Sequence, residues 1–327
     1  MTFDLADRVM QAHKRIRPDI RRTPIEGSDD LGRRTGAKLH FKWENEQITG
    51  SFKLRGALNK LRSLMPRERK AGVVSASTGN HGLAIGHASG LEGVDLILFL
   101  PETVAEVKRK KIEAMGVNLR FFGDDCEKTE VHARGFAQES GRVYVSPYND
   151  VDIVAGQGTV GVEVLQDLPD VQDIVVPVGG GGLIAGIGAY AKSVNPAIRI
   201  VGVEPGTSAF MKASIEAGKL VAFAEKPTFA DALAGGIEAG SITFSLCRQY
   251  VDDWIAVEEG AIVEAMAAIQ DAHGRIVEGA GAVALAGMLT DRGRFAGRNV
   301  ACVVSGGNID PERFRAIIKQ LGFLPQL

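Results

Sequence analysis

This 327-residue sequence does not have the residue patterns that disulfides, metal sites and membrane-spanning helices require. Its three cysteines, Cys126, Cys247 and Cys302, are odd in number and have no metal-like spacing. The six histidines include no H-x-x-x-H pair, which argues against a zinc site. No apolar run approaches the ~18 residues of a membrane-spanning helix, and the acidic first residues do not resemble a signal peptide. We therefore expect a reduced, cytoplasmic protein with no membrane partner.

An excess of charge of either sign is also absent, since 38 basic and 40 acidic side chains nearly cancel. No block of like charges suggests nucleic-acid binding, and the densest basic cluster, residues 108–111, is typical of a solvated helix face. Hydrophobic residues make up 45% of the chain, enough for a large core, and the length favours two lobes that share one site. The expected partner is a small molecule, not a nucleic acid.

Short apolar runs alternate with amphipathic stretches along the whole chain. Strands are predicted at residues 73–75, 96–100, 119–122, 143–145, 174–178, 200–203, 254–257 and 301–304. Helices are predicted between most of them, for example at residues 104–115, 258–273 and 280–289. This alternation predicts an α/β fold, in which parallel sheets are covered by helices.

One lysine stands in an informative local setting. Residues 51–57 read Ser-Phe-Lys-Leu-Arg-Gly-Ala, and Lys53 follows a turn at Thr49 and Gly50 and begins a helical run. The N-terminal end of a helix is positive, so a charged lysine gains no dipole benefit there. The placement makes sense if the amine must lose its proton and attack a carbonyl, as in a Schiff base with an aldehyde cofactor. A solvated lysine in the first helical turn explains this segment equally well.

Four successive glycines lie between a predicted strand and a predicted helix. The strand covers residues 174–178, the glycines residues 179–182, and the helix runs from Leu183 to about Lys192. Successive amides at a helix N-terminus form an anion site, because free N–H groups and the helix dipole both face the ligand. A tight turn, the alternative, rarely needs four glycines in a row.

The glycine run also imitates a dinucleotide-binding fingerprint. Residues 180–185 fit the pattern G-x-G-x-x-G/A, and the next strand ends at Glu204, where a nicotinamide-binding domain places its ribose-binding acid. Two features weigh against a dehydrogenase. The unit lies mid-chain after a complete lysine motif, and four glycines curl more closely round a single phosphate than a pyrophosphate turn requires.

Together these strings resemble the fold-type II pyridoxal-phosphate (PLP) enzymes, in particular the serine/threonine dehydratase and serine racemase group. Further strings in the same order carry the resemblance: STGNHG at 77–82, IVAGQGT at 153–159, GVEP at 202–205, VEGAGA at 277–282 and SGGN at 305–308. The resemblance implies a two-domain, tryptophan synthase β-like α/β fold with mainly parallel, twisted sheets flanked by helices. It implies a large PLP-binding domain of residues 1–69 and 148–327, a small substrate-binding domain of residues 70–147, and a homodimer or homotetramer.

The resemblance also assigns roles to individual residues. Lys53 would form the Schiff base with PLP and then act as the base at Cα, and Thr78 is the second catalytic position. The PLP contacts would come from Phe52, Lys53, Asn80, Gly179, Gly180, Gly181, Gly182, Leu183 and Ser305. The substrate carboxylate would be held by Ser77, Thr78, Asn80 and His81. For Phe52 and His81 a plain core position is the alternative.

Three of these positions bear on the reaction. Ser305 would face the pyridine nitrogen, and a hydroxyl there leaves that nitrogen largely unprotonated, which favours β-elimination. Serine racemases have serine at the position of Thr78, and the extra methyl of threonine restricts χ1 and disfavours racemisation. Glu204 matches a metal-binding glutamate, but Phe210 replaces its acidic partner, so we expect no divalent metal.

These features predict a PLP-dependent ammonia-lyase that converts a small β-hydroxy-α-amino acid, by default threonine or serine, into a 2-oxo acid and ammonia. The alternatives are a serine racemase-type amino-acid racemase and a dehydratase of 3-hydroxyaspartate, phenylserine or a hydroxyectoine-derived hydroxy amino acid. Specificity for the side chain depends on pocket shape, so the sequence leaves these alternatives open.

Overall fold

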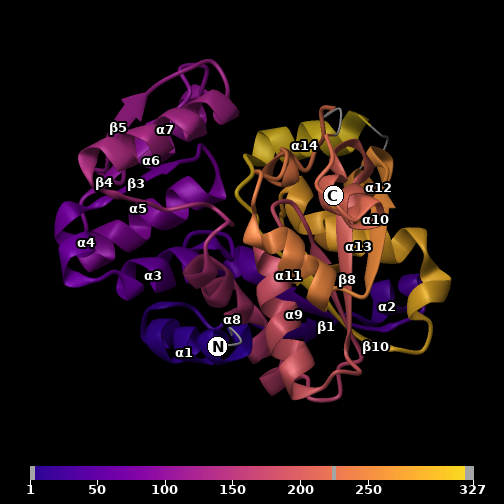
Figure 1. Ribbon diagram of the computed structural model, residues 1–327. Helices are drawn as coiled ribbons and strands as arrows, with labels where there is room; N and C mark the ends of the chain where they lie inside the picture. The colour runs from indigo at the N-terminus through magenta and orange to yellow at the C-terminus, as the bar shows by residue number, and fades with distance from the viewer. Residues whose placement is uncertain (1–3, 223–225, 321–327) are drawn as a thin grey trace.

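The computed structural model describes residues 4–222 and 226–320, and strands alternate with helices along most of the chain (Figure 1). The strands are β1 (Ile25–Gly27), β2 (Lys38–Trp43), β3 (Val73–Ala76), β4 (Leu96–Leu100), β5 (Asn118–Phe121), β6 (Val143–Tyr144), β7 (Asp173–Pro177), β8 (Arg199–Pro205), β9 (Asp253–Val257) and β10 (Asn299–Val304). The α-helices are α1 (Leu5–Ile16), α2 (Asp29–Thr35), α3 (Lys53–Ser63), α4 (Pro66–Ala71), α5 (Asn80–Glu92), α6 (Glu106–Glu113), α7 (Cys126–Ser140), α8 (Val151–Asp167), α9 (Gly182–Val194), α10 (Phe210–Ala217), α11 (Ile242–Tyr250), α12 (Glu259–His273), α13 (Gly279–Thr290) and α14 (Pro311–Gln320). A short 3-10 helix, η2 (Glu44–Glu46), follows β2.

Two sheets organise the strands. The larger has the order β1-β2-β10-β7-β8-β9 and the smaller the order β5-β4-β3-β6. Among the described strands, hydrogen-bonded neighbours run parallel, except that β1 pairs with β2 in the antiparallel direction. The predicted α/β class with mainly parallel sheets is confirmed.

Helices cover both faces of the six-stranded sheet. Along β10, Val300, Cys302 and Val304 lie in a core with residues of α12 and α13, whereas Ala301 and Val303 lie in a second core with residues of α8 and α9. A strand that is buried on both faces is apolar at every position. This is why the sequence pattern of β10 predicts a strand without any alternation.

The four-stranded sheet is covered in the same way. Along β4, Leu96, Leu98 and Leu100 lie in a core with residues of α3 and α5, whereas Ile97 and Phe99 lie in a core with residues of α7. Since α3 precedes residue 70, the apolar core of this part of the molecule extends across the predicted start of the small domain. The predicted domain boundaries stay a prediction, and residues 1–3 and 321–327 of the predicted large domain lie outside the described residues.

The sequence pattern does not reveal β1 and β2. The first has only three residues, and the second, Lys-Leu-His-Phe-Lys-Trp, mixes charged and apolar residues. Lys42 of β2 is fully buried, where its Nζ pairs with Glu163 at 2.6 Å. A charged side chain therefore occupies a strand position that a hydrophobic pattern would fill with an apolar residue.

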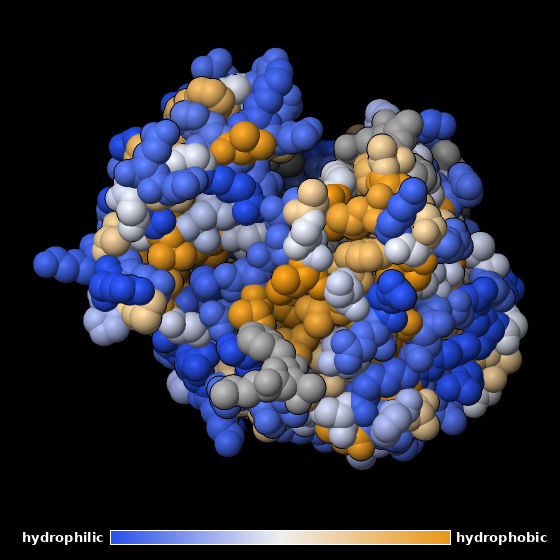
Figure 2. Space-filling view, viewed as in Figure 1, coloured by the Kyte–Doolittle hydropathy of each residue, from blue (hydrophilic) through white to orange (hydrophobic). Residues whose placement is uncertain are grey.

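The carboxyl ends of parallel strands carry the sequence motifs. β7 ends at Pro177 before the glycine run, β10 ends at Val304 before Ser305, and β3 ends at Ala76 before residues 77–79. Ligands of open parallel sheets bind beyond such strand ends. In the space-filling view, a hollow separates the part of the molecule with the four-stranded sheet from the part with the six-stranded sheet (Figure 2).

Candidate active site

The lysine segment lies against the end of β10. The amide of Phe52 donates a hydrogen bond of 3.1 Å to the carbonyl of Ser305, and Ser51 forms an isolated antiparallel bridge with Gly306. These contacts join two segments from opposite ends of the sequence. They bring Ser305 directly beside the start of α3, where Lys53 is the first helical residue.

Few groups around the side-chain amine of Lys53 stabilise a positive charge on it. Its Nζ donates a hydrogen bond of 2.8 Å to the carbonyl oxygen of Pro147 and lies 5.2 Å from the ring centroid of Phe52. Burial lowers the pKa of this amine from 10.5 to about 8. At pH 7 roughly a tenth of the side chain is therefore neutral, far more than for a solvated lysine, and only the neutral amine is a nucleophile or a base. A solvated lysine of the first helical turn would not have this environment.

The glycine run forms a turn that is closed on one side by an aromatic ring. Gly181 is the N-cap of α9 and has a left-handed backbone with φ of 82°. At Gly180 an added Cβ would lie 2.4 Å from the ring of Tyr148, so no larger residue fits there. The turn leaves the first amides of a 13-residue helix beside Tyr148, the residue that follows the Pro147 partner of Lys53. An anion such as a phosphate is favoured at this position.

Asn80, the first residue of α5, is held by two side chains of the six-stranded part. Its Nδ2 donates to Glu278 Oε1 at 2.6 Å, and its Oδ1 accepts from Asn308 Nδ2 at 2.7 Å. Glu278 lies directly over Gly306, where an added Cβ would be 2.3 Å from the carboxylate. The two contacts fix the plane of the Asn80 amide, and its second N–H stays available for a ligand oxygen.

The loop of residues 77–79 precedes the N-terminus of α5. The side chain of Ser77 accepts a hydrogen bond of 3.2 Å from the amide of Gly79, and Ser77 and Thr78 are both partly exposed. The amides at the start of this 13-residue helix and the two hydroxyl groups form a donor-rich surface. Such a surface suits a carboxylate.

The His81 side chain does not belong to this surface. It is 2% exposed, and its Nε2 lies 3.1 Å from the hydroxyl of Ser75, which itself donates to the carbonyl of Val145. Since that hydroxyl uses its proton, Nε2 is the donor in the contact with Ser75. Burial and the nearby Lys53 lower the pKa of His81 to about 3, so the ring is neutral. Of the donors of His81, only the backbone amide is available to an anion. Its ring occupies a core position.

Glu204 caps a helix in this structure. The fully buried carboxylate accepts hydrogen bonds from the amides of Met211, at 3.0 Å, and Lys212, at 2.7 Å, in the first turn of α10. Burial raises its pKa to about 7. Within residues 4–222 and 226–320, no group of three or more histidine, cysteine, aspartate or glutamate side chains is arranged to hold a metal. Because both carboxylate oxygens bind α10, Glu204 is also not placed to bind a ribose.

The residues around Lys53 fit a phosphate-bearing aromatic aldehyde. The amides at the start of α9 offer a phosphate site, Lys53 offers the amine, and Asn80 offers one N–H to a ring oxygen. Ser305 Oγ makes only a long hydrogen bond of 3.3 Å to the carbonyl of Ala280, so this hydroxyl can turn to a ring nitrogen. Leu183, in the first turn of α9, has its side chain packed in the core, so only its backbone could contact a phosphate there.

Four site residues were not identified from the sequence: Pro147, Tyr148, Glu278 and Asn308. Glu278 and Asn308 lie inside or beside strings that carried the family resemblance, which was the available signal. Pro147 and Tyr148 follow β6 at the carboxyl end of a strand, a position where ligand-contacting loops are common. Neither residue type by itself indicates a catalytic role.

Comparisons with known proteins point to one family. The family model described as "Pyridoxal-phosphate dependent enzyme" matches residues 16–306. An L-threonine ammonia-lyase of Thermotoga maritima is 38% identical over 95% of this chain and 77% of its own length. A catabolic L-threonine dehydratase of Escherichia coli K12 is 35% identical over 97% of this chain and 98% of its own.

Solved structures agree with these relatives. Maize serine racemase has a TM-score of 0.90 and 34% identity, and the match covers 97% of both chains. The processed form of threonine deaminase isoform 2 from Solanum lycopersicum has a TM-score of 0.90 and 30% identity, over 97% of this chain and 94% of that chain. Along residues 4–222 and 226–320 there is no helix with the length and apolar character to cross a membrane.

Proposed function

The chain belongs to the pyridoxal-phosphate dependent enzyme family, and from this premise we propose that it is an ammonia-lyase acting on a small β-hydroxy-α-amino acid. One observation carries the proposal. Lys53 presents an amine with a pKa lowered to about 8, held by the carbonyl of Pro147, and the preceding residue Phe52 donates its amide hydrogen bond to the carbonyl of Ser305. Such an amine can bond covalently to an aldehyde and later exchange protons at a nearby carbon.

The residues of this chain divide the work as follows. PLP, when bound, supplies an electron sink for the charge that develops at Cα. Lys53 takes the proton from Cα, and the loop of Ser77 and Thr78 with the first amides of α5 binds the carboxylate. The β-hydroxyl leaves as water, and hydrolysis of the released enamine gives a 2-oxo acid and ammonia. Asn80, fixed by Glu278 and Asn308, would donate its remaining N–H to PLP and help to hold it.

Elimination is favoured over racemisation at two positions. Ser305 would offer the ring nitrogen a hydroxyl instead of a carboxylate, and PLP would then be a weaker electron sink. Thr78 carries a methyl that restricts the rotation of its hydroxyl. A racemase needs a mobile acid on the face of Cα opposite to Lys53.

Threonine is the first substrate we propose, because two relatives that match 95% and 97% of this chain are described as an L-threonine ammonia-lyase and a catabolic L-threonine dehydratase. Serine, 3-hydroxyaspartate, phenylserine and a hydroxyectoine-derived hydroxy amino acid share the β-hydroxyl that the reaction expels. A second candidate function is amino-acid racemisation, which the high similarity to maize serine racemase favours.

We also propose a homodimer or homotetramer, a cytoplasmic location, and a division into a large domain of residues 1–69 and 148–327 and a small one of residues 70–147. The free cysteines, two of them buried, support a reducing compartment. The strands β3, β4, β5 and β6, all within residues 70–147, form one sheet, which supports the domain division.

The test is a product assay with the PLP-loaded protein. L-threonine should give equal amounts of 2-oxobutanoate and ammonia, and chiral analysis of the remaining threonine and serine should show little inversion. A panel of the other hydroxy amino acids then ranks the substrates. Formation of D-serine from L-serine as fast as pyruvate would favour the racemase, and no 2-oxo acid from any of these substrates would refute the proposal.

A further inference from the structure

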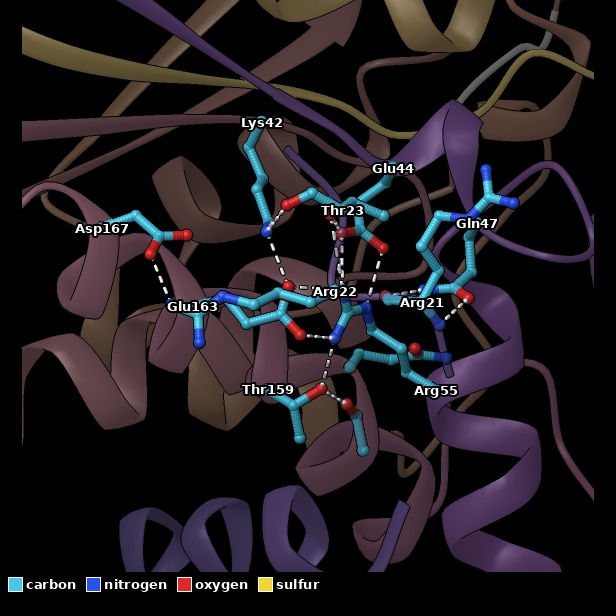
Figure 3. Close-up of polar contacts among 12 residues, drawn as sticks. Arg21, Arg22, Thr23, Lys42, Glu44, Gln47, Arg55, Thr159, Glu163 and Asp167 are labelled. Atoms are coloured by element: carbon cyan, nitrogen blue, oxygen red, sulfur yellow. Dashed lines mark hydrogen bonds and ion pairs between the residues drawn. The ribbon is translucent and has the colours of Figure 1, made fainter. Parts of the chain in front are cut away.

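A buried cluster of charged side chains includes Lys42, Glu44, Arg55 and Glu163 (Figure 3). Its centre is Arg55, two residues after Lys53, and Arg55 is fully buried. Its guanidinium makes paired hydrogen bonds of 2.7 and 2.8 Å to the carboxylate of Glu44 and paired bonds of 2.8 Å to that of Glu163. A fifth contact, of 3.2 Å, reaches the hydroxyl of Thr159.

The Arg55 cluster is electrically balanced. Lys42 is its second cation, with Nζ donating to Glu163 Oε2 at 2.6 Å and to the carbonyl of Thr23 at 2.7 Å. Burial alone would raise the pKa of Glu163, but Arg55 and Lys42 lower it to about 2. Two cations therefore face two carboxylates with no water-exposed member.

The cluster ties together elements that are distant in the sequence. Lys42 and Glu44 come from β2 and η2, Arg55 from α3, and Glu163 from α8. Next to Arg55 the backbones of α3 and α8 touch, since a Cβ added at Gly156 would lie 2.6 Å from the Cα of Gly56. The planar guanidinium of Arg55, bound by two carboxylates, therefore holds the first turn of α3 close to α8.

Stability alone is a weak reason for such a cluster. Removing four charged groups from water is costly, and well-packed apolar residues often replace a buried ion pair without loss of stability. A guanidinium fork that holds two carboxylates in one plane does, however, fix position and orientation closely. The cluster therefore serves to fix the geometry of the helix turn that begins with Lys53.

We infer that Arg55 is a positioning residue for Lys53, and that the Arg55 cluster holds the first turn of α3 so that Nζ reaches the carbonyl of Pro147 and the reacting carbon. This inference rests on the proposed function in taking Lys53 as the reacting amine. It is a mechanical role, not an electrostatic one. Burial is the cause of the lowered pKa of Lys53, with no contribution from Arg55, as expected beside a neutral cluster.

A matched pair of variants tests the inference. Arg55→Lys keeps the positive charge but loses the fork that binds two carboxylates. Arg298→Lys makes the same change where Arg298 binds the fully buried Asp173 with hydrogen bonds of 2.6 and 2.7 Å. Asp173 is the first residue of β7, at the opposite end of the strand from the glycine run, so this control is far from Lys53.

The first measurement follows Schiff-base absorbance when the full-length protein, freed of PLP, is mixed with it. We expect roughly ten- to hundredfold slower formation in Arg55→Lys, since a ~1 Å misplacement of a reacting group costs up to about a hundredfold. Arg298→Lys should match the wild type. In the lyase assay, kcat should fall with KM unchanged, and the pH at half-maximal Schiff-base rate should not shift.

Several outcomes would overturn the inference. Equal Schiff-base rates in the two variants would reduce Arg55 to a structural role, even if its variant melts earlier. A shifted pH midpoint would show that the cluster tunes charge. If Arg55→Lys does not fold, Glu163→Asp keeps all charges and withdraws one carboxylate, and a wild-type rate in that variant counts equally against the inference.

The Schiff-base measurement does not depend on the amino-acid substrate. A wild-type protein that captures PLP on Lys53 but releases no 2-oxo acid would refute the proposed function, while the rates of the variants still decide the role of Arg55. Capture of PLP on another lysine would overturn both proposals.

Discussion

Lys53 and Pro147 are joined by a hydrogen bond of 2.8 Å from the side-chain amine to a backbone carbonyl. Pro147 follows the strands of the four-stranded sheet, and Lys53 begins the helix α3, which shares a core with that sheet. The adjacent Tyr148 ring packs on Gly180 of the glycine run. One short segment thus positions both the amine and the candidate phosphate site, and a neutral carbonyl holds the amine without stabilising its charge as a carboxylate would.

Replacing Lys53 should abolish chemistry but not folding. Lys53→Ala should change the free energy of unfolding by no more than about 1 kcal/mol, as for other substitutions without a cavity or broken ion pair. Lyase activity should be lost, and borohydride treatment should attach no PLP. Mass mapping of the treated wild type should place PLP on the peptide with Lys53, and the exposed Lys70→Ala variant is the control. A reduced adduct on another lysine would contradict the assignment.

The rate of PLP capture should depend on pH in a defined direction. Because burial lowers the pKa of Lys53 to about 8, the protonated and unreactive form predominates below that pH. The Schiff-base rate of the PLP-free protein should therefore rise as pH increases toward 8 and level off above it. A free lysine side chain, with a pKa of 10.5, serves as the comparison and should still be gaining rate there. A protein midpoint near 10.5 would show that Lys53 is solvated.

Thr78 should control the balance between elimination and racemisation. Thr78→Ser keeps the hydroxyl but frees its rotation, so KM should change little while the ratio of racemisation to elimination rises. Thr78→Ala removes a donor to the substrate carboxylate and should raise KM by roughly tenfold, the equivalent of ~1.4 kcal/mol. Chiral chromatography together with 2-oxo acid release measures both reactions. An unchanged ratio in Thr78→Ser would mean that this side chain does not face Cα.

Glu204 should matter for stability and not for metal binding. A chelator should leave activity unchanged, and Glu204→Gln should not create or remove any response to Mg²⁺. Since the folded-state pKa is raised from 4.5 to about 7, stability due to Glu204 is present below pH 4.5 and is lost as pH rises through 7. Denaturant titrations from pH 5 to 8 should show this decline in the wild type only. Activity that EDTA removes and Mg²⁺ restores would contradict the capping role.

Short stretches of sequence were enough to predict the features of the protein that depend on local backbone geometry. Four glycines after an apolar strand predict an anion-binding turn because only glycine tolerates φ of 82° at Gly181 and the ring contact at Gly180. Uniformly apolar runs such as β10 identify buried parallel strands, and alternation with helices gives the α/β class. The family resemblance was visible in short strings because such strings contain the residues that these local geometries require.

Contacts between distant residues were decided only by the tertiary structure. The sequence does not place Glu278 and Asn308 on the amide of Asn80, or the carbonyl of Pro147 on Lys53, because a side chain's type says nothing of its partner across the fold. The hydrophobic pattern did not reveal β2, because Lys42 is charged. Its ion pair with Glu163 allows this charged residue to occupy a core position. Burial, which lowers the pKa of Lys53 and raises that of Glu204, is likewise a property of the packed chain, since desolvation requires the surrounding elements to be in place.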